Sequence, residues 1–307
     1  MSSITCSIRK GYFYRRLKIS TIHNMEKLKN IYRFLSGKHQ SLHMEYKVNM
    51  VPRYGHGLPP HEGLDQIISA NSGIYKDYLE RFKGYSGFLQ VIKNNKTNEN
   101  DPYWENNFLP GLDIVAIYGI IAEHKPKRYI EIGSGNSTKV VRKAIHEQGL
   151  TTQVISVDPF PRAEIDHLSD EVRREPIENI KDYSFIINEL EENDVLFIDN
   201  SHRVFPNSDA TVCFLELLPR LKKGVLVHIH DIYLPFDYPQ FMCDRFYNEQ
   251  YVLAAFILAN PERYQTIFPA YYVSQNNELI GVIEGFWKHE NTQNIERHGG
   301  SYWLQIG

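Results

Sequence analysis

From residue 128 onward, short apolar runs alternate with longer amphipathic stretches. The apolar runs predict strands at 129–132, 153–157, 173–177, 194–198 and 224–229. Apolar residues at helical spacing predict helices at 137–148, 182–191, 208–218 and 243–259. This alternation predicts an α/β fold with a mainly parallel sheet and right-handed crossovers.

Two later segments, 264–268 and 301–305, alternate apolar and polar residues, and they predict an antiparallel hairpin that extends the sheet to seven strands. Pro176 lies inside the predicted strand 173–177 and counts against it, because proline cannot donate a hydrogen bond to a sheet. A further apolar stretch, 112–122, predicts a helix that packs on the sheet just before the first strand.

The first 110 residues have a different character. Apolar positions within 64–90 recur at helical spacing, whereas the proline- and glycine-rich segment 51–61 is predicted to be a loop. This loop offers polar groups to a substrate, or else it is a linker on the surface; these groups are Arg53, Tyr54, His56 and His61. We therefore expect a helical and loop extension over 1–110 that caps the substrate, and a main domain over 111–307.

Residues 1–38 are strongly basic, with Glu26 as their one acid, and aromatic residues are interspersed. This pattern is typical of a surface helix that touches anionic lipid or a protein partner. A poorly packed extension is the favoured alternative. Met25 is a second candidate start, so the sequence does not decide whether residues 1–24 belong to the mature protein.

The composition of the 307 residues is that of an ordinary globular protein, with 42% hydrophobic and 23% charged residues. The net charge of −3 gives no indication that the protein as a whole binds nucleic acid. The three widely spaced cysteines predict reduced thiols in a cytoplasmic protein, and neither a disulfide framework nor a zinc site. No apolar run approaches the ~20 residues of a membrane span, and no apolar stretch follows the basic start as in a secretory signal.

The most informative stretch is 128–138, in which a strand leads through Gly133-Ser134-Gly135 into a helix that Asn136 or Ser137 can cap. The glycines allow positive φ and close backbone approach, and the free N–H groups of the first helical turn point at a ligand.

Two acids narrow the choice of ligand. Thr138 stands where the dinucleotide fingerprint has its third glycine, and Glu131 lies directly behind the turn. An acid there suits a ligand with a cationic end, such as the amino group of S-adenosylmethionine. Asp158 follows the next apolar run, at a distance that suits ribose hydroxyls. The alternative is an ordinary strand–helix turn with a surface acid.

A second group of polar residues follows the fourth and fifth predicted strands. Asp199 ends one strand and His230-Asp231 ends the other, so these residues are expected to meet at one edge of the sheet. Two carboxylates with an imidazole suit a divalent cation, with Asp199, His230 and Asp231 as its candidate ligands. The alternative is that both acids cap strands and accept backbone N–H groups.

The segments 131–137 and 157–159 resemble the class I S-adenosylmethionine-dependent methyltransferases, and the resemblance extends from about residue 113 to the C-terminus. It implies a Rossmann-like, doubly wound, mostly parallel seven-stranded sheet with a C-terminal antiparallel hairpin. The chain looks closest to a bacterial subgroup of uncharacterised substrate, with matching segments at 198–202 and 228–232. The expected cofactor-binding residues are Glu131, Gly133, Ser134, Gly135, Ser137, Asp158 and Asp199.

The chain is also distantly similar to catechol and macrocin O-methyltransferases, in which acids end the fourth and fifth strands. Asp199 and Asp231 match this pattern, but His230 replaces an acid, which leaves Mg²⁺, Mn²⁺, Fe²⁺ and no metal as alternatives. His202 stands where the catechol-type enzymes carry a catalytic lysine, and an imidazole can accept a hydroxyl proton near neutral pH. A loop histidine without a catalytic role is the alternative. His228 is expected to be a hydrogen-bonded core residue.

We therefore expect a methyltransferase that acts on an oxygen of a polar small molecule, with a sugar or polyol as the candidate acceptor. His202, Asp199 and Asp231 are its expected catalytic residues, and S-adenosylmethionine, with Mg²⁺ or Mn²⁺, its expected cofactors. The alternatives are an N-methyltransferase or an aminopropyl transferase on the same fold, or a non-catalytic nucleotide-binding scaffold. The sequence leaves open the acceptor and whether the chain forms a homo-oligomer.

Overall fold

A computed structural model describes residues 31–37, 40, 42–161 and 165–307. Residues 50–307 form one compact unit, and residues 1–49 belong to another, in which 31–36 are helical. Most of the basic segment 1–38 therefore lies outside the described residues, and the boundary expected near residue 110 stays a prediction. Within the described residues, no helix combines the length and apolar character that a membrane crossing requires.

A seven-stranded sheet runs through the larger unit in the order β3-β2-β1-β4-β5-β7-β6. The first five strands are parallel, and β7 pairs antiparallel with both β5 and β6. The strand bounds are β1 Arg128–Ile132, β2 Gln153–Val157, β3 Glu171–Arg173, β4 Val195–Ile198, β5 Leu226–His230, β6 Tyr264–Pro269 and β7 Ser301–Ile306. The predicted Rossmann-like, mostly parallel sheet with an antiparallel C-terminal pair is therefore confirmed.

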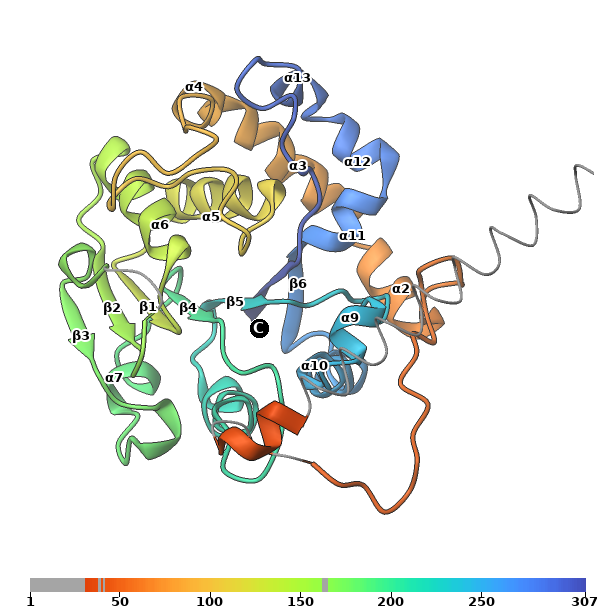
Figure 1. Cartoon of the computed structure of the whole chain (residues 1–307). Helices are drawn as coiled ribbons and strands as arrows, with labels where there is room; N and C mark the ends of the chain where they lie inside the picture. The colour runs from red at the N-terminus through yellow and green to blue at the C-terminus, as the bar shows by residue number, and fades with distance from the viewer. Residues whose placement is uncertain (1–30, 38–39, 41, 162–164) are drawn as a thin grey trace, which may run out of the picture. The chain divides into compact units, whose positions relative to one another are not determined.

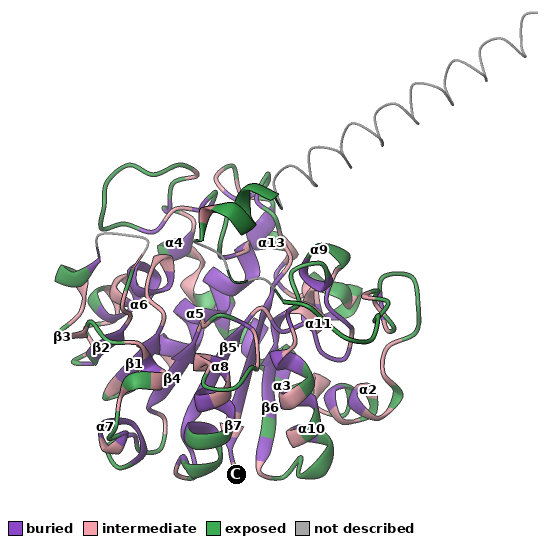
Figure 2. Cartoon of the chain, turned by 60° about the horizontal axis from the view of Figure 1, so that its bottom comes forward, coloured by how far each residue is buried: buried purple, intermediate pink, exposed green. Residues whose placement is uncertain are grey.

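Helices cover both faces of the sheet. Figure 1 shows α5 and α6 on one side of the sheet, and α7 and α10 on the other. Apart from β3, whose residues are half-buried, the strands are mostly buried between these layers, as the purple colouring in Figure 2 shows. The bounds of these helices are α5 Gly111–His124, α6 Asn136–Glu147, α7 Ser184–Ile187 and α10 Glu249–Ala259.

The predicted helices at 112–122 and 137–148 correspond closely to α5 and α6. Helix α5 is buried at every position from Gly111 to Ala122, because it lies between α6 and α3 (Ser72–Phe82). Helix α6 buries one face through Val140, Val141, Ala144 and Ile145, as its apolar spacing predicts.

Four predicted elements differ from the structure. The helix predicted at 182–191 is only α7 (Ser184–Ile187), which a turn at 188–189 follows. The third strand ends at Arg173, before Pro176, which cannot donate to the ladder and starts no strand. The predicted helix 208–218 is α8 (Asp209–Val212) followed by a π turn, Cys213–Leu217, and a 3₁₀ turn, Leu218–Arg220. The predicted helix 243–259 is two helices, α9 (Gln240–Cys243) and α10, because Phe246 has a φ of 62° that no α-helix accommodates.

The remaining helices surround this framework. Residues 64–90 form α2 (Glu62–Ser69), α3, a 3₁₀ turn and α4 (Ser86–Leu89), as their helical spacing predicts. Between β6 and β7 lie α11 (Ala270–Gln275), α12 (Asn277–Gly281) and α13 (Glu284–Trp287), so the two strands pair without forming a tight hairpin. This insertion brings residues 294–298 back toward the start of α5, where Gly111 N–H donates to Glu296 O at 2.9 Å.

Candidate functional site

The register of the sheet brings the chemically interesting residues to one edge. Ile132 lies opposite Val157 on one side and Ile198 on the other, and Ile198 lies opposite Ile229. The residues that follow these positions therefore emerge together at the carboxyl ends of β2, β1, β4 and β5. These residues are Asp158, Gly133, Asp199 and the pair His230-Asp231.

The turn after β1 has no room for a side chain. Gly133 has a φ of +82°, and a Cβ on it would overlap the carbonyl oxygen of Asp199. Asp199 N–H donates to Ile132 O at 2.9 Å, and Gly133 N–H donates to Val157 O at 3.0 Å. Both the left-handed backbone and the close approach require glycine here. The turn is thereby held against the ends of the two neighbouring strands.

Glu131 has no exposed surface. Its Oε1 accepts hydrogen bonds from Thr138 Oγ1 and Ser156 Oγ, both at 2.6 Å, and Ser137 Oγ lies 3.4 Å from Oε2. Burial raises the pKa of Glu131 to about 7, although these hydroxyls oppose the shift. The carboxylate therefore joins β1, β2 and the start of α6, and its direct contact with a cofactor stays a prediction.

The expected cap of α6 at Asn136 or Ser137 is wrong by one to two residues. The helix begins at Asn136 with Gly135 as its N-cap, and Thr138 Oγ1 accepts from Gly135 N–H at 3.2 Å. Ser137 is buried and turns toward Glu131 instead. Space around Gly135 is open, because a Cβ there would meet no atom within 4 Å. A ligand can thus approach the backbone at the helix start.

Asp158 connects the ends of β1 and β2. Its Oδ2 accepts from Ser134 N–H at 2.9 Å and from Ser134 Oγ at 3.2 Å, while its Oδ1 accepts from Phe160 N–H at 2.8 Å. The carboxylate is partly exposed, so it borders the open space at the glycine turn. Ser134 and Asp158 form one unit of this edge, a contact that sequence spacing alone does not reveal.

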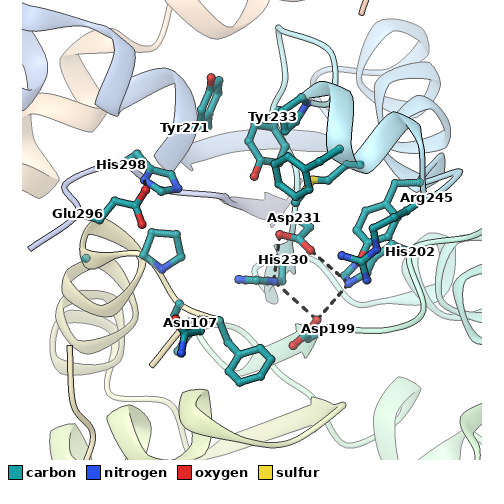
Figure 3. A pocket seen from close by; sticks show the side chains of 18 of the residues that line it. Asn107, Asp199, His202, His230, Asp231, Tyr233, Arg245, Tyr271, Glu296 and His298 are labelled. Atoms are coloured by element: carbon teal, nitrogen blue, oxygen red, sulfur yellow. Dashed lines mark ion pairs between the residues drawn. The ribbon is translucent and has the colours of Figure 1, made fainter. Parts of the chain in front are cut away.

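Two carboxylates and two imidazoles face one another at the ends of β4 and β5 (Figure 3). Asp199 Oδ1 and Asp231 Oδ2 each lie 3.4 Å from His202 Nε2. His230 Nδ1 lies 3.7 Å from Asp199 Oδ1 and 3.5 Å from Asp231 Oδ1. These separations are longer than usual hydrogen bonds but close enough for the charges of the four groups to interact strongly. The structure therefore brings together all four residues that the sequence places at these strand ends.

His202 is held from behind by a residue that the sequence analysis missed. Its Nδ1 lies 2.6 Å from Oε1 of the fully buried Glu249, at the start of α10, and its ring stacks on Tyr247 with 4.5 Å between centroids. Burial alone would lower the pKa of His202, but the carboxylates of Glu249, Asp199 and Asp231 outweigh it and raise this pKa to about 9. The expectation that His202 titrates near neutral pH is therefore wrong for this arrangement.

His230 also has a buried carboxylate behind it. Asp113, in the first turn of α5, has no exposed surface and accepts from Gly300 N–H at 2.8 Å and Ser301 Oγ at 2.6 Å. Its Oδ2 lies 3.9 Å from His230 Nε2, which has no hydrogen-bond partner among the described residues. Burial would lower the pKa of His230, but Asp231, Asp199 and Asp113 raise it.

Two backbone conformations in this cluster are unusual. His202 and Asp231 have φ values of 62° and 54°, in the left-handed region that side chains other than glycine rarely adopt. Each costs on the order of 1 kcal/mol and persists only where the surroundings enforce it. His202 is fixed by Glu249, whereas Asp231 is followed by Ile232, whose N–H donates to Gly300 O at 2.9 Å.

His228 belongs to the core, as expected, but it is not hydrogen-bonded. Its ring stacks on Phe197 at 4.0 Å between centroids and meets Trp303 edge-on, and neither ring nitrogen has a partner among the described residues. Burial holds the pKa of His228 well below its usual range. A neutral ring packed as an aromatic side chain takes no part in the polar cluster.

A cavity of about 1320 Å³ opens in front of the cluster. Asp199, His202, His230 and Asp231 form part of its lining, and Trp104 and nearby loop residues add another wall. Of the polar residues expected to reach a substrate from the segment 51–61, His56 alone borders this cavity. His61 instead caps α2, accepting from Leu64 N–H.

The carboxylate and imidazole donors of Asp199, His230 and Asp231 are chemically suited to a divalent cation, and they lie within 3.7 Å of one another through His230 Nδ1. The carboxylate of Glu249 accepts from the far nitrogen of His202, which fixes the orientation of this ring beside the three candidate ligands. However, the described residues contain no group of three or more His, Cys, Asp or Glu side chains arranged as a formed metal site.

Because burial raises the pKa of Glu131 in the folded protein, protonation of this residue favours folding. Its contribution is present below the unfolded pKa of about 4.5 and is lost as pH rises through about 7, at a cost of up to about 3 kcal/mol. Urea unfolding across this range should show the free energy of unfolding falling with pH, and Glu131→Gln should flatten that fall. Glu123→Gln, at a partly exposed acid, is the control. An unchanged slope in Glu131→Gln would contradict the assignment.

The chain is distantly similar to several solved structures. PaMTH1, an SAH-bound methyltransferase from Podospora anserina, is 14% identical over 83% of this chain and 100% of that chain, with a TM-score of 0.40. An SAH-bound O-methyltransferase from Bacillus cereus is 14% identical over 75% and 91%, with a TM-score of 0.36. The branched-chain polyamine synthase from Thermus thermophilus is 10% identical over 74% and 63%, with a TM-score of 0.38. A comparison with curated proteins finds no match.

One family model matches the sequence. It is described as a methyltransferase domain and covers residues 130–232, from within β1 to just beyond β5. The matched region contains the glycine turn, Asp158, Asp199 and the His230-Asp231 pair, which are the residues gathered at the edge of the sheet. Residues 130–232 therefore match a methyltransferase domain, and the sheet order agrees with the Rossmann-like fold expected from the sequence.

Proposed function

We propose that the chain transfers the methyl group of S-adenosylmethionine to an oxygen of a polar small molecule, with a sugar or polyol as the candidate acceptor. The observation that carries this proposal is the convergence of Asp199, His202 and Asp231 at the floor of the cavity, directly beside the Gly133 turn. A cofactor at that turn would place its methyl group between the turn and the cavity. An acceptor hydroxyl in the cavity would then meet a basic group there.

The cofactor is proposed to lie against the start of α6. The open space at Gly135 admits a ligand to the free N–H groups of the first helical turn. Asp158 is placed to accept ribose hydroxyls if its hydrogen bonds to Ser134 rearrange. The full proposed set is Glu131, Gly133, Ser134, Gly135, Ser137, Asp158 and Asp199, with Glu131 and Ser137 acting on the turn from behind.

Methyl transfer requires little of the enzyme beyond positioning and deprotonation, because the sulfonium is already a strong electrophile. As the new O–C bond forms, the C–S bond breaks and S-adenosylhomocysteine leaves. The hydroxyl proton passes to Nε2 of His202. Glu249 holds the opposite ring nitrogen in place, which aims Nε2 at the cavity.

The proposal extends to a divalent cation held by Asp199, His230 and Asp231. When bound, such a cation would supply charge stabilisation for an acceptor oxygen. The carboxylate and imidazole donors suit Mn²⁺ as well as Mg²⁺, since imidazole is a softer ligand than oxygen.

The cofactor assignment is tested by calorimetry with S-adenosylhomocysteine. Asp158→Asn should weaken binding by about 1–3 kcal/mol, as expected for loss of a charged hydrogen-bond acceptor. Asp182→Asn is the control, because Asp182 is exposed and accepts hydrogen bonds from Ser184, away from the glycine turn. Binding of NAD with no signal from S-adenosylhomocysteine would overturn the proposal. If the Asp158 variant and the control variant bind S-adenosylhomocysteine equally tightly, Asp158 is not part of the site.

The role of His202 is tested by measuring its pKa and by replacing its side chain. In metal-free protein, the His202 ring should titrate near 9 by NMR, because the three surrounding carboxylates favour its protonated form. Since only the neutral ring accepts a proton, kcat should rise as pH approaches that value. His202→Gln should lower kcat by about 10²–10⁴-fold with little change in cofactor affinity. His167→Gln, at an exposed histidine, is the control, and unchanged kcat in His202→Gln would end the assignment.

The cation is tested by chelation together with a direct measure of metal. Activity should fall in chelator and return with Mg²⁺ or Mn²⁺, while binding of S-adenosylhomocysteine persists. Mn²⁺ titration followed by electron paramagnetic resonance should show a bound ion in the wild type and not in Asp231→Asn. Full turnover after exhaustive chelation, or equal Mn²⁺ binding by both proteins, would contradict a cation site at Asp199 and Asp231.

A further inference from the structure

One side of the cavity carries two arginines on a shared aromatic ring. Arg203 and Arg245 both border the cavity, and their guanidinium carbons lie 5.0 Å and 4.6 Å from the centroid of the Tyr247 ring. Arg203 Nε also donates to Arg245 O at 2.9 Å, and its Nη1 donates to Ser201 O at 2.7 Å. Tyr247 is buried, so it gives both cations a fixed support.

Neither guanidinium has an ion pair with any residue that the structure describes. Within the described part of the chain, no carboxylate pairs with Arg203 or Arg245, whereas other arginines are paired, such as Arg142 with Asp170 and Arg173 with Glu171. Arg203 donates only to backbone carbonyls, and its neighbour offers its guanidinium to no described acceptor. Both side chains therefore retain the planar donor edges that bind carboxylate or phosphate groups.

Positive and negative side chains therefore line different parts of the cavity. His202 contacts the same Tyr247 ring, so the arginines lie close to the catalytic cluster, and Figure 3 shows Arg245 on the same side as His202. The carboxylates of Asp199 and Asp231 lie beyond His202 Nε2. An anionic group is repelled by these acids and attracted by the arginines, whereas a hydroxyl is accepted beside the acids. This polarity fixes which end of a ligand points at the methyl group.

We infer that the acceptor carries an anionic group, a phosphate monoester or a carboxylate, which Arg203 and Arg245 bind while its hydroxyl faces His202. The inference rests on the proposed function for the statement that this ligand is methylated. Binding of the anion itself depends only on the two arginines and the cavity. Aromatic side chains elsewhere in the lining, Tyr233 and Tyr271 among them, suit a compact organic body between the two ends.

The test compares three probes of similar shape: phenyl phosphate, benzoate and neutral benzyl alcohol. Calorimetry with the full-length wild type should show one of the anions binding at least about tenfold more tightly than benzyl alcohol, with affinity falling as salt is raised. Arg203→Gln and Arg245→Gln should each remove that preference. Arg220→Gln should retain it, since Arg220 is exposed, has no ion pair among the described residues and lies outside the cavity lining.

The outcomes separate this inference from the proposed function. A stronger phenyl phosphate signal assigns a phosphate monoester, and a stronger benzoate signal assigns a carboxylic acid. Failure of both anions to exceed benzyl alcohol, or equal binding in the arginine variants with native circular dichroism spectra, would overturn the inference. S-adenosylhomocysteine is titrated separately. Anion binding without S-adenosylhomocysteine binding would reject methyl transfer and retain the anion subsite, and the reverse result would reject the subsite alone.

Discussion

The close approach of Gly133 to the carbonyl oxygen of Asp199 is the constraint on which the site depends. It joins the glycine turn after β1 to the first acid after β4, with no side chain between them. Since β5 pairs with β4, Asp231 follows into the same region. A single backbone contact thus sets the spacing between the start of α6 and the acidic residues that follow β4 and β5.

Buried carboxylates support this edge of the sheet from behind. Glu131 holds the glycine turn, Glu249 holds His202, and Asp113 stands behind His230, and all three are withdrawn from solvent. Burial of a carboxylate is costly unless hydrogen bonds or a cation compensate it. Here hydroxyl groups compensate Glu131, an imidazole compensates Glu249, and a backbone N–H and a serine hydroxyl compensate Asp113. The same arrangement raises the pKa values of both histidines and enforces the left-handed backbone of His202.

The cavity combines segments that are distant in sequence. Its walls come from the loop before α5, the ends of β4 and β5, the region of α9 and the segment that returns to β7. The proline-rich segment 51–61 packs on the loop after β5, where Asp237 accepts from Arg53 N–H at 2.6 Å and His56 Nε2 lies 2.9 Å from Asp237 O. Loops at the carboxyl ends of parallel strands can vary without disturbing the sheet, which is why such edges hold ligand sites.

The sequence by itself determined the parallel sheet, the antiparallel terminal pair, the glycine turn and the strand-end residues Asp199, His230 and Asp231. These features follow from local periodicity and from the rule that parallel strands present their carboxyl ends together. The tertiary structure alone decided that Glu249 reaches His202, that Asp113 lies behind His230, and that Arg203 and Arg245 share the ring of Tyr247. These contacts join residues from separate elements, and their charges act through burial, which no local pattern encodes. For the same reason, the titration of His202 could not be read from its position three residues after Asp199.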